Sequence, residues 1–560
     1  MAILLFATAA PDLKIVGADA PTFTRDVAPL LYKSCLDCHR PGQGAPFSLV
    51  SYQDARKHAA DIVTVTSART MPPWPPGYDY GTFQNSRALS SNQITLLRTW
   101  VETGMAEGAP GDLPPLPTPH SGWQLGQPDL IVTLPQPYKL AAEGKDTYRN
   151  FVLQVPLGTN RFVRAVEFNP GNAACVHHAF VKLARTPAAR RLDGHEDQPG
   201  FGGLMLPEGI EMPEGHFLTW QPGKIPAAED PRFAWRLDPG NDLVLQLHMR
   251  STGKPESVQP SVALYFSDRT PTVTPFKFAL ASLAIDLPPG AADAVIKDTW
   301  TLPAGLRLLR VLPHAHYLGQ DLQGYATLPD GTRRWLVRIQ DWDFNWQGDY
   351  VYREPVDLPA GTVVTMEYHY DNSTNNVRNP NSPPRRVLYG PGSADEMAEL
   401  WFQALPLAPA SLPLLQREYN NKMGRLSRDY AEFQLARDPA NVPARINLAT
   451  YLLGTGRREQ ARAALQKALE YQPENEQGHY LMGVLYRTQN RLAEARTEFE
   501  QAIKANPKNG KAHGNLGIVL AGLGEWEPAV QHLEAALRID PEDTVAKNSL
   551  DEIRRANPKN

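Results

Sequence analysis

The sequence of 560 residues contains only three cysteines, Cys35, Cys38 and Cys175. At most one disulfide can form, so a disulfide-stapled scaffold is excluded. No run of about 18 apolar residues, the length that a membrane-spanning helix requires, is present. The formal net charge of -4 excludes the basic surface typical of nucleic-acid-binding or polybasic membrane-binding proteins. The remaining composition is that of a globular protein of about three or four domains.

Proline is abundant but unevenly distributed, since 45 of the 52 prolines lie in residues 1–420. The clusters Leu113–Pro119 and Pro406–Pro413 predict stiff, extended linkers. They divide the chain into an N-terminal part, a linker, a middle part, a second linker and a C-terminal part, over residues 21–112, 113–127, 128–405, 406–424 and 425–560.

The middle part consists of short apolar runs separated by Pro, Gly and Asn. Runs such as Phe162–Phe168, Leu243–His248 and Val363–Tyr368 have the composition of β-strands. This pattern predicts one antiparallel β-sandwich or two in succession.

The C-terminal part repeats with a period of 34 residues, at Pro439, Pro473, Pro507 and Pro541. The same period relates small residues, which allow two antiparallel helices to approach closely: Ala449/Gly483/Gly517, Ala461/Ala495/Ala529 and Ala468/Ala502/Ala536. The region resembles the tetratricopeptide repeat over about residues 440–541, with a capping helix to about 556. Such arrays bind protein partners or mediate self-association.

The N-terminal part contains Cys35-Leu36-Asp37-Cys38-His39, a pattern typical of c-type haem attachment. The two thiols would form thioethers to one haem, and His39 would be the proximal iron ligand. The alternative is half of a zinc site, but the remaining cysteine lies 137 residues further on.

The expected distal haem ligand is Met71, which opens Met71-Pro72-Pro73-Trp74. This segment resembles small cytochrome c domains, in which a Met-Pro loop precedes a final helix, here 91–103. Met105 and His58 are the alternatives. Covalent haem attachment in bacteria implies export to the periplasm. Residues 1–20, with the apolar stretch 2–7, are accordingly interpreted as a truncated signal segment, although the basic region is missing and an ordinary N-terminal tail is the alternative.

Five histidines and one methionine of the middle part form candidate metal ligands. His177 and His178 are adjacent, His248 ends a predicted strand, and His314 and His316 form a His-x-His pair whose members share a strand face. Imidazole suits copper or zinc, and the thioether of Met397 favours copper, because soft ligands stabilise Cu(I).

In order along the chain, these motifs resemble the type II copper, ascorbate-dependent monooxygenases, the family of peptidylglycine α-hydroxylating monooxygenase and dopamine β-monooxygenase. The resemblance implies two copper ions in successive β-sandwich subdomains, 128–280 and 281–405. One copper would transfer electrons and be held by His177, His178 and His248. The other would activate O2 and be held by His314, His316 and Met397. Gln246 occupies a position that the family implicates in the electron path between the coppers.

The resemblance implies hydroxylation of a C–H bond of a small-molecule substrate by O2, with electrons from ascorbate or another redox partner. We expect the fused haem to supplement or replace that donor. The residues that bind a peptide carboxylate in the family are replaced by Leu312, Glu399 and Trp401, so an anionic peptide end is not the expected substrate. The alternative function is a non-catalytic electron-transfer or copper-binding scaffold that recruits partners through the repeats. A zinc enzyme ranks third.

Three further histidines, His195, His216 and His369, match no motif and are interpreted as loop or surface residues. Cys175 is interpreted as a small buried residue.

Overall fold

The computed structural model describes residues 20–556 apart from 42–44, 75, 78, 85, 118–121, 145, 195, 204–205, 207–208, 223, 225, 227–228 and 542. The predicted signal segment therefore lies outside the described residues, except for Ala20. The chain divides into two compact units, one of which includes residues up to 280, 287–385 and 391–412, and the other 281–286, 386–390 and 413 onward. No helix in the described part of the chain has the length and apolar character needed to span a membrane.

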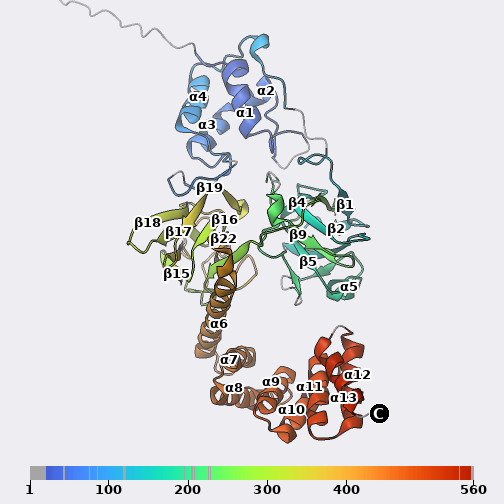
Figure 1. The fold of residues 1–560 in the computed structure, drawn as a ribbon. Coiled ribbons are helices and arrows are strands. Elements are labelled where there is room, and N and C mark those ends of the chain that lie inside the picture. The colour runs from blue at the N-terminus through green and yellow to red at the C-terminus, as the bar shows by residue number, and fades with distance from the viewer. Residues whose placement is uncertain are drawn as a thin grey trace, which may run out of the picture. The chain divides into compact units, whose positions relative to one another are not determined.

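The N-terminal domain is a small helical bundle (Figure 1). Its helices are η1 (Phe23–Val27), α1 (Ala28–Ser34), α2 (Tyr52–Lys57), α3 (Ala59–Ser67), α4 (Ser91–Glu102) and the short η2 (Pro110–Asp112). Ser90 caps α4 through a reciprocal capping box with Gln93, which fixes where the predicted last helix begins. Leu97 and Trp100 of α4 pack with Phe23 and Leu31 of the first helices, and these contacts close the bundle.

The first part of the β-rich region packs two antiparallel sheets on one core. The sheet orders are β1-β12-β4-β9 and β6-β3-β10-β5-β7, with β8 beside β5. The elements are β1 (Leu130–Thr133), β2 (Tyr138–Leu140), β3 (Thr147–Gln154), β4 (Arg161–Asn169), β5 (Val176–Ala184), α5 (Ala188–Leu192), β6 (Phe201–Gly202), β7 (Ile210–Glu211), β8 (Thr219–Trp220), η3 (Pro231–Phe233), β9 (Trp235–Leu237), β10 (Asp242–Met249), β11 (Glu256–Val258) and β12 (Ser261–Ser267). Buried Leu264 of one sheet and Leu245 of the other belong to the same core, as expected for a sandwich.

The second part contains the sheets β13-β22-β16-β19 and β15-β20-β17-β18. Its elements are β13 (Phe276–Ala281), β14 (Asp286–Leu287), β15 (Ala294–Thr301), β16 (Leu306–Ala315), β17 (Gly319–Thr327), β18 (Arg333–Ile339), η4 (Phe344–Trp346), β19 (Tyr350–Leu358), β20 (Val363–Tyr370), β21 (Val387–Leu388) and β22 (Ala398–Pro406). The predicted boundary near 280 is too late, because β13 already pairs with β22. The boundary lies between β12 and β13.

Four residues of the N-terminal domain, Trp74, Tyr80, Phe83 and Gln84, lie against β18 and β19, and we call them the strap. Phe83 forms a β-bridge with Tyr352. The Gln84 N–H donates to the carbonyl of Val351 at 2.8 Å. The strap thus joins the helical bundle to the second sandwich by backbone hydrogen bonds.

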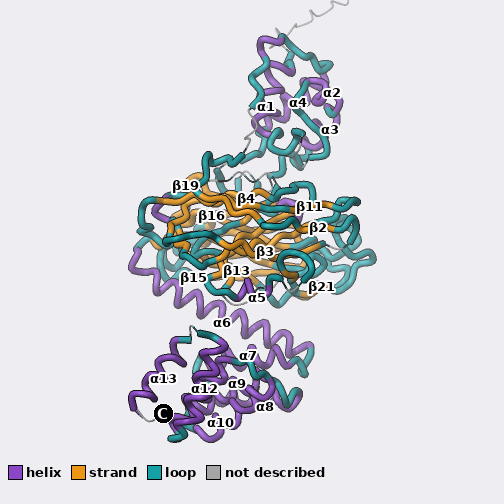
Figure 2. The backbone as a smooth tube through the Cα atoms, turned by 90° about the vertical axis from the view of Figure 1, so that its right-hand side faces the viewer, coloured by secondary structure: helices purple, strands orange, loops and turns teal. Residues whose placement is uncertain are grey.

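The C-terminal region is a series of antiparallel helix pairs (Figure 2). It comprises η5 (Pro409–Ser411), α6 (Leu412–Arg437), α7 (Val442–Gly454), α8 (Arg458–Tyr471), α9 (Glu476–Thr488), α10 (Leu492–Ala505), α11 (Gly510–Gly522), α12 (Trp526–Ile539) and α13 (Thr544–Ala556). A Cβ on Gly517 would lie 2.6 Å from Leu533, so the small residues of the 34-residue period do allow close helix contact. The predicted linker over 406–424 is wrong beyond residue 411, because α6 begins at Leu412 with Pro413 in its first turn, where proline is tolerated.

Candidate metal centres

The three histidines of the first sandwich come from neighbouring strands. His178 on β5 is the direct partner of His248 on β10, while Met249 pairs with Val176. His177 is therefore the extra residue of a β-bulge. Side chains of consecutive strand residues normally point to opposite faces. The bulge interrupts this alternation, which explains how two adjacent histidines reach the same site.

The nitrogen atoms of this cluster are spaced as metal ligands would be. The ligand atoms of His177, His178 and His248 all lie within 4.8 Å of one another. The Nδ1 atoms of His177 and His178 are 3.3 Å apart. Two nitrogens bound at about 2.0 Å in tetrahedral geometry would be separated by about 3.3 Å.

His248 provides the clearest test of whether a metal fits this cluster. Its Nε2 lies 2.8 Å from a carboxylate oxygen of Asp146, which holds the ring by one nitrogen. Its Nδ1 is buried and has no hydrogen-bond partner among the residues that the structure describes. Carboxylates commonly orient metal-ligating histidines in this way, and a buried nitrogen without a partner is costly unless it is coordinated. The cluster therefore fits a metal ion.

Burial keeps the rings of His177 and His178 neutral, which metal binding requires. Burial, followed by the charges of His248 and Arg250, lowers the pKa of His177 to about 4. Burial, followed by the other histidines, also lowers the pKa of His178 well below its usual value.

The second cluster lies at the end of β16. His314 is in the strand and His316 follows it, with ring centroids 5.3 Å apart. Ala315 pairs with Ala398 of β22, so continuing the antiparallel register by one residue places Met397 opposite His316. Directly opposed residues lie on the same face of the sheet. The register thus brings all three predicted ligands of this cluster to one face.

Hydrogen bonds orient both rings of this cluster. Nδ1 of His314 lies 2.5 Å from the amide oxygen of Gln347, and Nδ1 of His316 lies 3.1 Å from the carbonyl of Asp395. Each ring therefore presents Nε2 for coordination. Burial, followed by the charge of His314, lowers the pKa of His316 to about 3, so this ring is also neutral at physiological pH.

Glu396 is a supporting residue that the sequence motifs did not identify, although it directly precedes Met397. It is fully buried and accepts hydrogen bonds from the backbone N–H groups of His316, Leu318 and Met397. Burial raises its pKa to about 8. Its side chain fixes the backbone of two predicted ligands.

One residue of each cluster contacts the same phenyl ring, that of Phe344. The ring centroid of Phe344 is 6.1 Å from that of His177 and 5.2 Å from that of His316. Phe344 belongs to η4, a few residues before Gln347. Gln246 is buried two residues before His248, on the same face of β10. Its predicted role in an electron path stays a prediction.

The predicted haem motif forms a tight turn after α1. The N–H groups of Cys38 and His39 both donate to the carbonyl of Cys35. Both thiols are free and half-buried, and burial raises the pKa of Cys35 to about 12. Nδ1 of His39 lies 3.1 Å from the carbonyl of Phe47, which leaves Nε2 for an axial bond. These residues fit a covalently attached haem, with His39 oriented as axial histidines require.

The three candidate distal ligands have different surroundings in the bundle. Met71 is half-buried, and its N–H donates to the carbonyl of Val65 at 3.2 Å. His58 stacks on Phe47 at 3.9 Å, and Phe47 in turn contacts His39 at 4.7 Å. Met105 packs on the core of the bundle. Met71 stays the predicted ligand.

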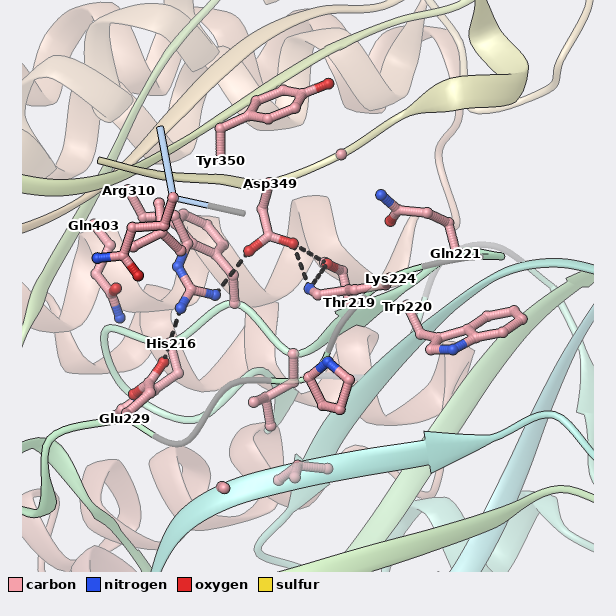
Figure 3. Close-up of a pocket in the computed structure, with 18 of the residues that line it drawn as sticks. His216, Thr219, Trp220, Gln221, Lys224, Glu229, Arg310, Asp349, Tyr350 and Gln403 are labelled. Carbon is pink, nitrogen blue, oxygen red and sulfur yellow. Dashed lines mark hydrogen bonds and ion pairs between the residues drawn. The ribbon is translucent and has the colours of Figure 1, made fainter. Parts of the chain in front are cut away.

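His216 lies in the loop between β7 and β8, as one of the two predicted settings, but it is not a surface residue. Its side chain is 2% exposed and its Nδ1 lies 2.7 Å from a carboxylate oxygen of Glu229. This pair borders a cavity of about 400 Å³ between the two sandwiches. Asp349 lies between Lys224 and Thr219 on one side and Arg310 on the other (Figure 3). These buried charges come from distant segments, so no local motif identifies them.

The structure also describes His369 and Cys175, which matched no functional motif. His369 is half-buried on β20 and pairs with Asp293 at 2.7 Å. Cys175 is buried in the core of the first sandwich, as predicted. His195 lies outside the described residues.

Comparisons with known proteins concern the C-terminal region. The family model described as tetratricopeptide repeat matches residues 446–500 and 480–544. Among solved structures, the crystal structure of MamA is 20% identical over 25% of this chain and 83% of its own, with a TM-score of 0.24. The first TPR of Spaghetti (RPAP3), bound to an HSP90 peptide, is 21% identical over 20% of this chain and 91% of its own, with a TM-score of 0.20. No curated protein matches the sequence. The C-terminal region of this chain is thus built of tetratricopeptide repeats, which are protein-interaction modules.

Proposed function

We propose that this chain is an exported copper-dependent monooxygenase that hydroxylates a C–H bond of an organic small molecule with O2. The observation that carries the proposal is the pair of histidine clusters that both contact Phe344. In the first cluster, His248 has a buried Nδ1 that finds no hydrogen-bond partner in the described part of the chain. In the second, His314 and His316 use Nδ1 for hydrogen bonds and keep Nε2 for a ligand.

The ligand chemistry supports copper at both clusters. His177, His178 and His248 would hold one ion, and His314, His316 and Met397 the other. A thioether ligand suits copper and gives zinc no advantage. Copper bound there would supply one-electron redox chemistry and O2 activation. One oxygen atom would enter the substrate, and the other would leave as water after a reductant has delivered two electrons and two protons have been taken up. Asp146, Gln347 and the carbonyl of Asp395 orient the rings, and Glu396 fixes the backbone of the second cluster.

The surroundings of His314 disfavour a carboxylate-bearing substrate. Glu399 is the direct strand partner of His314, and Trp401 pairs with Leu312. The indole N–H of Trp401 donates to Glu399 at 2.8 Å. Beside His314, this face of the sheet therefore presents the carboxylate of Glu399 and the apolar side chains of Leu312 and Trp401. The carboxylate of Glu399 would repel a carboxylate on the substrate, because like charges repel.

The N-terminal domain would hold a c-type haem through Cys35, Cys38, His39 and Met71. A haem bound there supplies a one-electron carrier. We propose that it passes electrons to the copper region, with ascorbate or another one-electron reductant as the external donor. Haem attachment at this motif also supports the proposed export.

Metal analysis together with O2 consumption tests the proposal. The holoprotein should contain about two copper ions per chain and consume O2 with reductant and substrate, which a panel of organic compounds would identify by the appearance of hydroxylated products. Met397→Leu keeps most of the side-chain volume and removes only the sulfur, so it should retain the fold and lose the O2 uptake that depends on substrate. Unchanged uptake in Met397→Leu would refute the assignment of the second cluster.

A second candidate function is a non-catalytic copper-binding or electron-transfer scaffold that recruits a protein partner. The tetratricopeptide match and the separate compact unit from residue 413 onward support it. Two bound coppers without O2 consumption across the substrate panel would favour this function. A chain ending at residue 411 that keeps its oligomeric state would indicate an external partner, whereas a change in that state would indicate self-association.

A further inference from the structure

Two lysines, one from each sandwich, have no carboxylate partner. Lys182 lies on β5 of the first sandwich, and Lys277 lies on β13 of the second. Both residues are half-buried, and neither side chain forms a hydrogen bond or an ion pair with the described residues. By contrast, the largely buried Lys224 is paired with Asp349.

The two ammonium groups are close enough to affect each other. Burial, followed by the charge of Lys277, lowers the pKa of Lys182. Burial also lowers the pKa of Lys277, although the charge of Glu211 opposes that shift. Two partly buried like charges destabilise each other, and an anion that contacts both would offset this repulsion.

Aromatic rings surround the ammonium group of Lys277. Its Nζ lies 5.7 Å from the ring centroid of Phe217 and 5.9 Å from that of Trp401. The two rings meet edge-on at 6.5 Å. Phe217 belongs to the first sandwich and Trp401 to β22 of the second, so this ammonium group lies where the sandwiches meet. Beside such apolar surface an anion is attracted to ammonium groups more strongly than in water.

Trp401 lies close to the second histidine cluster. Its strand partner is Leu312, which precedes His314 by two residues on the same face of β16. Two residues of a strand span about 7 Å. In the first sandwich, Lys182 follows His178 by four residues, or about 13 Å of strand. An anion between the two lysines therefore lies on the order of 10 Å from the histidine clusters.

Building on the proposed function, we propose that Lys182 and Lys277 bind the acidic group of an elongated organic substrate. Its apolar chain lies along Trp401, and the C–H bond to be hydroxylated lies at the second histidine cluster. Glu399, the strand partner of His314, repels an acidic group at that end, so a remote acidic group is accepted and an adjacent one is not. The acidic group takes no part in the reaction, in which the reductant of the proposed function supplies the two electrons.

Isothermal titration calorimetry of the full chain, loaded with haem and copper, tests this site with octanoate as the probe. Lys182→Met and Lys277→Met keep most of the aliphatic stem and remove the charge, so each should weaken octanoate binding by about tenfold or more. The uncharged 1-octanol should bind the wild type no more tightly than the variants. Lys254→Met is the matched control, since Lys254 of the same region is 74% exposed, and it should leave octanoate binding unchanged. No octanoate binding by the wild type, or equal binding by both lysine variants, would overturn the site.

Sulfate and product analysis test the orientation of the substrate. Sulfate should bind more weakly than octanoate, because it has no apolar chain. Sulfate binding that depends on both lysines, without octanoate binding, would indicate a site for an inorganic anion and overturn the assignment to the substrate. Where octanoate is hydroxylated, mass spectrometry should place the hydroxyl group away from the carboxylate, and a 2-hydroxy product would overturn the orientation.

The outcome also separates this inference from the proposed function. A chain that binds two coppers and hydroxylates uncharged compounds, but binds octanoate equally well without the lysine charges, would overturn the acid-binding site alone. Octanoate binding that depends on the lysines, in a copper-loaded chain that consumes no O2 with any compound, would refute the monooxygenase and leave the acid-binding site in place.

Discussion

Asp349 is the most heavily buried carboxylate of the ion network beside the cavity, and its removal should destabilise the β-rich region strongly. Its side chain is 2% exposed and it pairs with Lys224 and Arg310, which are 20% and 11% exposed. Asp349→Ala would leave two largely buried cations without this partner. Breaking a buried ion pair by removing one member costs about 3–5 kcal/mol.

The pKa of Asp349 gives a second measure of the same effect. Burial alone would raise this pKa, but the charges of Lys224 and Arg310 outweigh burial and lower the pKa to about 2. The pKa of an unfolded aspartate is about 3.9, and a shift of this size contributes about 2–3 kcal/mol to stability. Because the folded pKa is depressed, this contribution is present above about pH 4 and is lost as the pH falls towards 2. The cost of breaking a buried ion pair and the pKa shift of Asp349 thus both indicate that Asp349→Ala lowers the free energy of unfolding by about 3 kcal/mol.

Urea unfolding followed by tryptophan fluorescence measures this loss, because ten of the 11 tryptophans precede residue 412. Asp357→Ala is the matched control, since Asp357 pairs with Arg307 where both side chains are 48% exposed. Exposed pairs of this kind contribute about 1 kcal/mol or less. The reasoning is refuted if Asp349→Ala lowers the free energy of unfolding at pH 7 no more than Asp357→Ala does.

Three further predictions concern the metal, the haem and the repeats. His248→Ala should lower the copper content by about one ion per chain in elemental analysis, whereas His369→Ala, which lies outside both clusters, should not change it. Cys35→Ala should shift the visible spectrum of the haem in alkaline pyridine to longer wavelength, because one haem vinyl group would remain unreacted; an unshifted spectrum would argue against thioether formation at Cys35. Gly517→Leu should destabilise the repeats by about 1–3 kcal/mol through overpacking against Leu533, as measured by the far-UV circular dichroism melt. Gly454→Leu is its control, since a Cβ at Gly454 meets open space.

The repeat helices and many strands were predictable because their signals are local. The 34-residue period requires the same packing in each helix pair, and the run Leu243–His248 lies within β10 as expected. The boundary between the two sandwiches was misplaced because an apolar run in the sequence does not show which sheet its strand joins, and β13 joins the second sandwich. The end of the second linker was missed because Pro413 suggested extended chain, although proline is also favoured in the first turn of a helix.

The candidate site was predictable as a set of residue types but not as an arrangement. The motifs named the histidines and Met397. The bulge at His177 depends on pairing with β10, and the contacts of Phe344 with both clusters depend on how η4 packs. The burial of His216 depends on Glu229 and Arg310, which approach it only in the folded chain. Interactions between distant segments have no signature in a single sequence.

The strap has a consequence for dissecting the molecule. β19 is the last strand of its sheet, so without the strap one side of its backbone would be open to solvent. Phe83 and Gln84 cover that side at Tyr352 and Val351. Uncovered edge strands pair readily with other chains. A shortened protein that begins after the helical bundle would expose this edge together with the aromatic ring of Tyr350, which Trp74 and Phe83 contact in the full chain, and it should aggregate where the full chain does not.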